Sequence, residues 1–153
     1  MIYLSPSFSV GEFEKSPTAL RLQIDNTMPP AAIENAKLLC KHVLQPIRNK
    51  WSLPVTINSG YRSANLNRAM GGSQTSQHML GMAADIEIHG VSNAILWQWI
   101  HDNLEFDQLI AEYLKPNDPK AGWVHVSFNN GKNRKQALSC VNGKYLSGLH
   151  YAV

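Results

Sequence analysis

Apolar residues in the first third of the chain recur at three- and four-residue steps, which is the spacing of an amphipathic helix. The longest pattern of this kind opens at Pro29-Pro30 and predicts a helix with one apolar stripe facing the core. The stripe comprises Ile33, Ala36, Cys40, Val43, Leu44 and Ile47. Because proline lacks an amide hydrogen and clashes with the carbonyl group one turn earlier, Pro46 is expected to kink or interrupt this helix near its end.

Capping residues mark the starts of three shorter helices. Ser9 and Glu12 have the spacing of a capping box, in which each side chain bonds the other residue's backbone amide. Pro17 suits the first position of a second helix, and Ser63 is expected to cap a third. A longer helix is expected over residues 91–104, where apolar residues again follow helical steps.

Apolar and β-branched runs bounded by turn residues predict strands, most of them in the second half of the chain. The expected strands cover residues 54–58, 83–88, 106–113, 123–128, 136–141 and 144–146. Asn142-Gly143, between the last two, is a strong hairpin signal. Helices come first, strands cluster later, and neighbouring strands are expected to be antiparallel. This order favours an α+β domain over a doubly wound parallel sheet.

Length and composition narrow the class of protein. A chain of 153 residues suits one core, so residues 1–153 are expected to form a single domain. Apolar residues make up 44% and charged residues 16%, which excludes a disordered chain and a coiled coil. No apolar run approaches the ~18–20 residues of a membrane span, and Met1 to Ser9 lacks a secretory signal. We therefore expect no membrane partner and synthesis in the cytoplasm.

Charge and cysteine content limit the ligands that the chain could use. The net charge is only +3, and the densest basic cluster is Lys132, Arg134 and Lys135, so a nucleic-acid partner is not expected. Cys40 and Cys140 lie far apart without a second cysteine beside either, which excludes a thiolate zinc cluster. We expect two buried free thiols, although a disulfide between them stays open. Any catalytic metal must therefore be held by His, Asp and Glu.

Two stretches carry the candidate chemistry. In the first, His78 follows a glycine-rich loop, and Asp85 lies seven residues later inside an apolar strand. An ionised Asp buried there would cost several kcal/mol without a partner, and a metal ion is a good partner. In the second, His125 lies in the middle of another apolar strand. Two His and one Asp with an open fourth position would make a catalytic zinc site, although each residue alone is more often a loop, salt-bridged or core residue.

These residues belong to a longer pattern, Ser-x-His-x-x-Gly-x-Ala-x-Asp, with Trp-x-His about forty residues further on. Here it reads Ser76, His78, Gly81, Ala83, Asp85, Trp123 and His125. The pattern resembles the zinc D-alanyl-D-alanine carboxypeptidase family, which includes bacterial wall-trimming carboxypeptidases and phage endolysin endopeptidases. The hedgehog signalling domain has the same zinc site and fold. Upstream, Ser59-Gly60-Tyr61-Arg62-Ser63 is similar to the family's substrate-arginine motif, and the resemblance covers about Phe8 to Phe128.

The resemblance implies a fold and a set of roles. The fold would be a group of N-terminal helices packed on a small, mainly antiparallel sheet that carries a zinc site. The implied ligands of Zn²⁺ are His78, Asp85 and His125. Arg62 would stabilise an oxyanion or hold a substrate carbonyl, and Ser76 and Tyr61 would bind the substrate.

One position departs from the family pattern. Many relatives place a catalytic Glu three residues before the second His, where this chain has Gly122. The best replacement is Glu112, because a hairpin centred near Asp118 would place it directly opposite His125, with Cβ atoms ~4.5–5.5 Å apart. Glu112 would then act as general base, or else orient His125. Glu87 is the competing acid.

The expected function is a zinc peptidase that cleaves the peptide stems of peptidoglycan, of the carboxypeptidase or the endopeptidase type. A single catalytic domain acting as a monomer would suffice. Since no secretory signal is seen, delivery to the cell wall by a holin or a virion is expected, which favours a phage or prophage lysin. The alternative is a non-catalytic, metal-containing binding or virion structural module of the same fold, to which Gly122 gives some weight.

Overall fold

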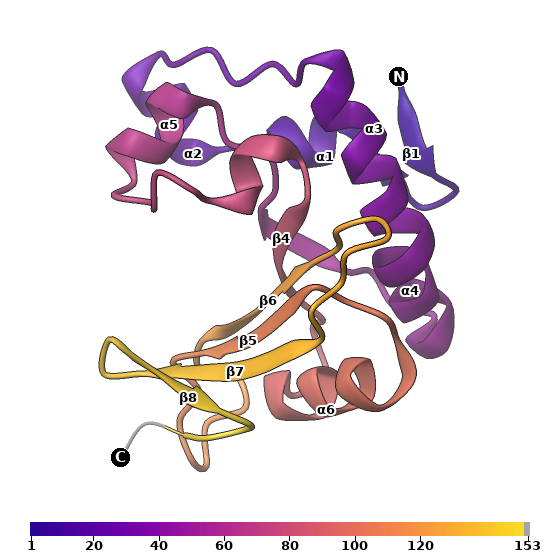
Figure 1. Ribbon diagram of the computed structural model, residues 1–153, viewed down its shortest axis with the longest axis vertical. Helices are drawn as coiled ribbons and strands as arrows, with labels where there is room; N and C mark the ends of the chain where they lie inside the picture. Colours follow the sequence, from indigo (N-terminus) through magenta and orange to yellow (C-terminus); the bar gives the residue numbers. More distant parts are fainter. Residues whose placement is uncertain (152–153) are drawn as a thin grey trace.

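A six-stranded sheet lies at the centre of the fold, with the strand order β3-β4-β6-β5-β7-β8 (Figure 1). The structure is a computed structural model that describes residues 1–151. The six strands are β3 (Thr56–Ser59), β4 (Ala83–Glu87), β5 (Gln108–Glu112), β6 (Trp123–Ser127), β7 (Gln136–Val141) and β8 (Lys144–Ser147). A separate short pair, β1 (Tyr3–Ser5) and β2 (Phe8–Ser9), was not expected from the sequence pattern.

The expected α+β class with a mainly antiparallel sheet is confirmed, with one exception in the pairing of neighbours. Strands β5 and β7 are parallel, so the expectation that neighbouring strands are all antiparallel is wrong. Strands β4 and β5 occupy both edges of β6, so β7 cannot pair with β6 and lies on the outer edge of β5. The loop after β6 returns the chain to the start of β5, where the amide of Gln136 donates to the carbonyl of Asp107.

The long helix expected after Pro29 is divided into three parts. Helix α3 (Pro30–Leu39) continues into a π-helical turn, η1 (Cys40–Leu44), and then into α4 (Gln45–Trp51). The amide of Gln45 bonds the carbonyl of Cys40, five residues back, in the widened turn directly before Pro46. A wider turn makes room for the proline ring, which would otherwise press against the preceding turn. The interruption expected at Pro46 therefore takes the form of a π turn.

The other helices begin after serine caps, of which the sequence pattern predicts Ser9 and Ser63. Helices α1 (Val10–Glu14), α2 (Pro17–Leu22), α5 (Ala64–Ala69) and α6 (Asn93–Asn103) each follow a serine whose side chain accepts a backbone amide. At Ser9 the full capping box with Glu12 is present. A 3₁₀ turn, η2 (Gln77–Leu80), precedes β4. None of the helices within residues 1–151 is both long and apolar enough to span a membrane.

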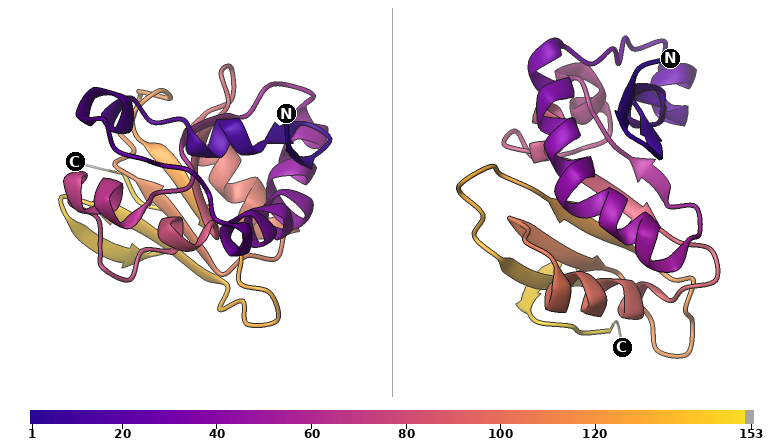
Figure 2. Two further views of the ribbon diagram at one scale, coloured as in Figure 1. Left: turned by 90° about the horizontal axis from the view of Figure 1, so that it is seen from above. Right: turned by 90° about the vertical axis from the view of Figure 1, so that its right-hand side faces the viewer.

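The two faces of the sheet have different partners. Seen from the right-hand side of Figure 1, helices α3, α4 and α6 lie in front of the sheet (Figure 2). Alternate residues of β5 and β6 are fully buried in the core on the helix side. These residues are Leu109, Ala111, Val124 and Val126. Because successive side chains point to opposite faces, His125 and Glu112 lie on the face away from these helices. Cys40 and Cys140 are buried free thiols, as expected.

Candidate metal centre

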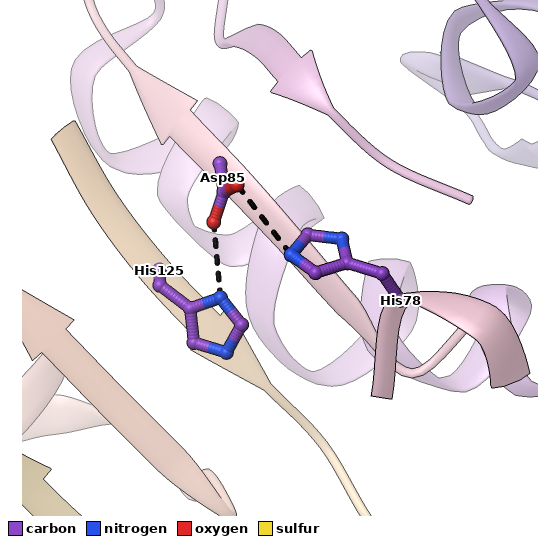
Figure 3. A group of neighbouring side chains, drawn as sticks. All are labelled: His78, Asp85 and His125. Carbon is purple, nitrogen blue, oxygen red and sulfur yellow. Dashed lines mark hydrogen bonds and ion pairs between the residues drawn. The ribbon is translucent and has the colours of Figure 1, made fainter. Parts of the chain in front are cut away.

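The three predicted zinc ligands lie together on the open face of the sheet (Figure 3). One donor atom from each of His78, Asp85 and His125 lies within 4.8 Å of the other two. Asp85 and His125 are directly opposite each other on β4 and β6, and His125 Nδ1 lies 2.9 Å from Asp85 Oδ1. His78, on η2, places its Nε2 3.4 Å from Asp85 Oδ2. Side chains from a turn and two strands thus meet at one point.

Local chain geometry brings η2 to the start of β4. Gly81 ends η2 with φ +73°, a conformation that residues with a Cβ rarely adopt. A Cβ at this position would collide with the carbonyl oxygen of Ala32 on α3, so the turn can lie directly against that helix. Ser76 caps η2 by accepting the amide of His78. The glycine and the serine of the sequence motif therefore have structural roles in placing His78.

The ring of His78 is held in one orientation by a backbone carbonyl. Its Nδ1 lies 2.7 Å from the carbonyl oxygen of Gly60, so Nδ1 carries the hydrogen and donates it. Nε2, which faces Asp85, then keeps its lone pair. The amide of Arg62 donates to the carbonyl of His78, which ties the loop after β3 to η2. An oriented, unprotonated imidazole nitrogen is what a metal ligand requires.

The charges of the cluster also suit a metal ion. Burial by itself would raise the pKa of Asp85, but the hydrogen bond that His125 Nδ1 donates to its carboxylate outweighs burial, so the pKa lies below its usual range. Burial lowers the pKa of His78 against the opposing effect of Asp85, which keeps the imidazole neutral near pH 7. Metal binding needs an ionised carboxylate and neutral imidazoles. Two imidazole nitrogens and a carboxylate oxygen are a common ligand set of catalytic zinc, so these residues fit the ion.

Arg62 lies beside the cluster and is fixed by three side chains. Its Nε donates to Ser59 Oγ at 2.9 Å, and Nη1 and Nη2 lie 3.4 Å from Asn67 Oδ1 and Asp85 Oδ2. Only 14% of the Arg62 side chain is exposed. Burial lowers the pKa of Arg62 and the charge of Asp85 opposes this, but an arginine stays charged in either case. A rigid cationic fork therefore borders the cluster.

The position of Glu112 differs from the expected register. It pairs with Trp123, while His125 pairs with Ile110, so the prediction that Glu112 directly opposes His125 is wrong by two residues. The turn is the cause: Gly122 has φ +71°, and a Cβ there would collide with the Glu112 carbonyl oxygen. This close approach makes Trp123 the partner of Glu112. A shift of two residues keeps Glu112 on the face of His125, as its diagonal neighbour.

Glu112 lines the cavity with a carboxylate that has no ion-pair partner among residues 1–151. Burial raises the pKa of Glu112, the charge of Asp85 adds to this, and His125 opposes it. A carboxyl group with a raised pKa beside a metal-binding cluster is suited to accept and release a proton. The competing acid, Glu87, lies outside this cavity and accepts hydrogen bonds from Asn58 and Asn93.

The cluster opens into a cavity of about 600 Å³. Six of the seven predicted site residues line it: Arg62, Ser76, His78, Asp85, Glu112 and His125. Tyr61 does not, because it is only 8% exposed and packs in the hydrophobic core. Its amide bonds the carbonyl of Phe13, and its own carbonyl accepts from Asn26. Tyr61 therefore supports the backbone next to Arg62.

A second polar group in the cavity was missed by the sequence reasoning. Asp107 is 1% exposed, and its carboxylate accepts from Gln77 Nε2 at 2.7 Å and from Arg134 Nε and Nη2 at 2.9 and 3.0 Å. Gln77 Oε1 is buried and has no hydrogen-bond partner among residues 1–151. An acidic residue directly after Phe106 at the start of an apolar strand was the available signal, since a buried carboxylate needs partners.

Comparison with known proteins agrees with this site. A model of the Peptidase M15 family matches residues 6–127, a segment that contains all three predicted zinc ligands. No curated protein matches the chain. Because the matched segment covers well over half of the chain, the protein belongs to the Peptidase M15 family, whose members are zinc-dependent metallopeptidases.

Proposed function

We propose that this protein is a zinc peptidase that cleaves the peptide stems of bacterial peptidoglycan, by either a carboxypeptidase or an endopeptidase cut. The observation that supports this most is that Arg62 and Glu112 line the same cavity as the His78, Asp85 and His125 cluster. Membership of the family supports a peptidoglycan-type substrate. All of these residues come from one chain, so the proposed enzyme needs no second copy and acts as a monomer.

Glu112 is the proposed general base. Zinc held by His78, Asp85 and His125 would polarise the scissile carbonyl and make the attacking water more acidic. Glu112 takes one proton from that water while the oxygen of the water forms a bond to the carbonyl carbon. The protonated Glu112 then gives the same proton to the leaving nitrogen when the carbon–nitrogen bond breaks. The carboxylate is thereby restored, and one water is consumed for each bond cut.

Arg62 and Ser76 are proposed to hold the substrate and its developing charge. The Arg62 guanidinium is already positioned by Ser59 and Asp85, so it can donate to the carbonyl oxygen as negative charge grows there. A fixed donor stabilises the transition state without the cost of reorientation. Ser76 Oγ accepts the amide of His78 and keeps its own hydroxyl hydrogen, which can donate to a substrate carbonyl.

The finer biological role that we propose is that of a phage or prophage lysin. It follows from the resemblance to phage endolysin endopeptidases. In this role a holin or a virion carries the enzyme made in the cytoplasm to the cell wall. The proposal is tested by expressing the protein in bacteria with and without a holin. Lysis that needs both the holin and Glu112 supports it, whereas lysis without a holin contradicts it.

The competing function is a non-catalytic, metal-containing binding module or virion structural module. It is favoured by Gly122, which occupies the position where many relatives carry the catalytic Glu. This alternative requires zinc binding without turnover, and no loss of function in Glu112→Gln. The enzyme is favoured by the Glu112 carboxylate, which lines the cavity and has no ion-pair partner among residues 1–151.

Mass spectrometry of muropeptides tests the proposal directly. Purified peptidoglycan is digested with the zinc-loaded protein, with the chelated protein and with the chelated protein after zinc is returned. Cleaved stems in the first and third digests only are the expected result, and the mass of the products identifies the bond. Intact stems in every digest would refute the enzymatic function. Glu87→Gln, which alters an acid outside the cavity, is the matched control and should cleave normally.

A further inference from the structure

One wall of the cavity is built by residues beyond the segment that matches the family. The match ends at residue 127, yet Asn129, Lys132, Arg134 and Tyr145 also line the cavity. The first three come from the loop between β6 and β7, and Tyr145 comes from β8 (Figure 1). The family match by itself therefore implies nothing about the properties of this wall.

Asp107 anchors the loop that carries Arg134. The carboxylate accepts from the Arg134 backbone amide, from Nε and from Nη2, all within 3.0 Å. It also accepts from Gln77, the residue before His78, so one buried carboxylate ties the loop to η2. Three bonds to one partner fix both the backbone and the guanidinium of Arg134. Its Nη1 makes no hydrogen bond within residues 1–151, and 56% of the side chain is exposed.

The charge of this wall is positive. Of the three cations that line the cavity, Arg62 pairs with Asp85 and Arg134 pairs with Asp107. Lys132 has no ion pair within residues 1–151, and it is exposed to the cavity. We call Lys132 and Arg134 the cationic wall. After the negative charge of Asp107 is subtracted, one positive charge remains to attract an anionic group.

The cationic wall lies at a definite distance from the metal-binding cluster along β5. Asp107 precedes the first residue of β5, and Ile110, three residues later, pairs with His125. A rise of about 3.3 Å per residue separates the two positions by ~10 Å. An extended peptide whose scissile bond lies at the cluster would therefore reach the wall with a group two or three residues away.

We propose that the cationic wall binds a carboxylate of the substrate peptide, two or three residues from the bond that is cut. The inference rests on the proposed peptidase function and adds its selectivity. Arg134 supplies the free edge of a guanidinium held by Asp107, and Lys132 supplies a second, unpaired charge. The carboxylate can belong to an acidic side chain or to the free C-terminus of the stem peptide. Both present the same planar anion to the guanidinium.

The test uses three synthetic stem peptides and the zinc-loaded enzyme. One peptide has both carboxylates free, the second has the side-chain carboxylate as an amide, and the third has the C-terminal carboxylate as an amide. Amidation of the bound carboxylate is expected to lower kcat/KM about tenfold, mainly through KM, and more weakly at high salt. The peptide that suffers this loss identifies the source. Equal kcat/KM for all three peptides would overturn the proposal.

Variants of the cationic wall show whether its residues cause the preference for the free carboxylate. In Arg134→Gln the preference for the carboxylate should disappear, and in Lys132→Gln it should fall about threefold. Lys135→Gln is the matched control, because it removes the same charge from the same loop but does not line the cavity. An unchanged preference in Arg134→Gln, or an equal loss in Lys135→Gln, would contradict the assignment.

Two further measurements separate loss of charge from loss of folding, and peptide binding from hydrolysis. Arg134→Lys retains a cation beside Asp107 and should restore part of the preference, which separates charge from loss of folding. Peptide binding to zinc-loaded Glu112→Gln, followed by calorimetry, should show the same tenfold difference between acid and amide without any hydrolysis. If wild-type protein cuts none of the peptides, the peptidase proposal fails, whereas the binding difference still supports or refutes the cationic wall.

Discussion

Asp85 and His125 are cross-strand partners in adjacent antiparallel strands, and the carboxylate of one lies 2.9 Å from the ring nitrogen of the other. Directly opposed residues are the closest pairs that a sheet offers. This pairing places two of the three predicted metal ligands on rigid strands, so only His78 depends on the conformation of a turn. The cluster is therefore expected to be largely preorganised before the metal binds.

Loss of the central carboxylate should abolish tight metal binding. Asp85→Asn keeps the shape of the side chain but removes the charge, and the expected zinc content falls from about one ion per chain to nearly none. Elemental analysis and a competition titration with a chelating dye measure this. Glu87→Gln, two residues along the same strand, should keep full zinc content. Equal zinc in Asp85→Asn and wild type would exclude the proposed centre.

Replacement of Glu112 should separate activity from stability. Glu112→Gln is expected to lower kcat about 10²- to 10⁴-fold while zinc content stays unchanged. The raised pKa means that ionised Glu112 destabilises the fold at pH above that pKa, so the neutral amide should raise Tm at neutral pH. Activity assays stopped at fixed times measure kcat, and thermal melting of the chelated protein measures Tm. Glu105→Gln, at an exposed position just before β5, should change neither quantity.

The pH profile should report the ionisation of Glu112. A general base works only when deprotonated, so kcat/KM rises as pH increases through the pKa of this group. Burial, with a further contribution from Asp85, raises that pKa. The acid limb is therefore expected at a higher pH than for an ordinary glutamate. Rates measured between about pH 4 and pH 8 at fixed ionic strength locate the limb. A limb at or below the ordinary value would argue against Glu112 as the base.

Local sequence signals were enough to predict most of the elements, whereas the resemblance to a known family was needed to choose the candidate metal ligands. Serine caps, helical stripes and the Asn142-Gly143 turn act over a few residues, and the structure has helices and strands where they indicate. Asn142 and Gly143 both have positive φ, the conformation of a tight hairpin turn. The His78 and Asp85 motif also lies within one short segment.

The parts that could not be predicted depend on contacts between distant segments. The parallel pairing of β5 and β7 follows from which sheet edge remains free. The position of Glu112 depends on the turn conformation at Gly122, which no apolar pattern encodes. Arg134 and Asp107 lie 27 positions apart in the sequence, and only the folded chain shows that they meet. Register and long-range polar pairs are thus decided by tertiary structure.

A lysine at position 62 is not expected to support the activity that the arginine supports. Arg62→Lys keeps the charge but loses the fork that Ser59, Asn67 and Asp85 hold in place. We expect kcat to fall about 10²-fold with little change in zinc content, the loss typical of one missing oxyanion donor. Arg68→Lys on α5, an exposed arginine outside the cavity, is the control. A reduction confined to KM would point to substrate binding in place of oxyanion stabilisation.

Gly122 should tolerate no side chain, because two separate costs act there. Its φ of +71° disfavours any residue with a Cβ by about 1–2 kcal/mol, and the new atom would also collide with the Glu112 carbonyl oxygen. Gly122→Ala is therefore expected to lower the free energy of unfolding by about 3 kcal/mol and to lower activity, since relief of the collision displaces Glu112. Gly143→Ala isolates the first cost, because φ is +77° and no atom lies within 4 Å of the added Cβ. Denaturant unfolding of both variants gives the comparison.

Gly122→Glu should likewise fail to restore activity to Glu112→Gln. Its success would show that the carboxylate can act from position 122 and would refute the requirement for glycine in this turn.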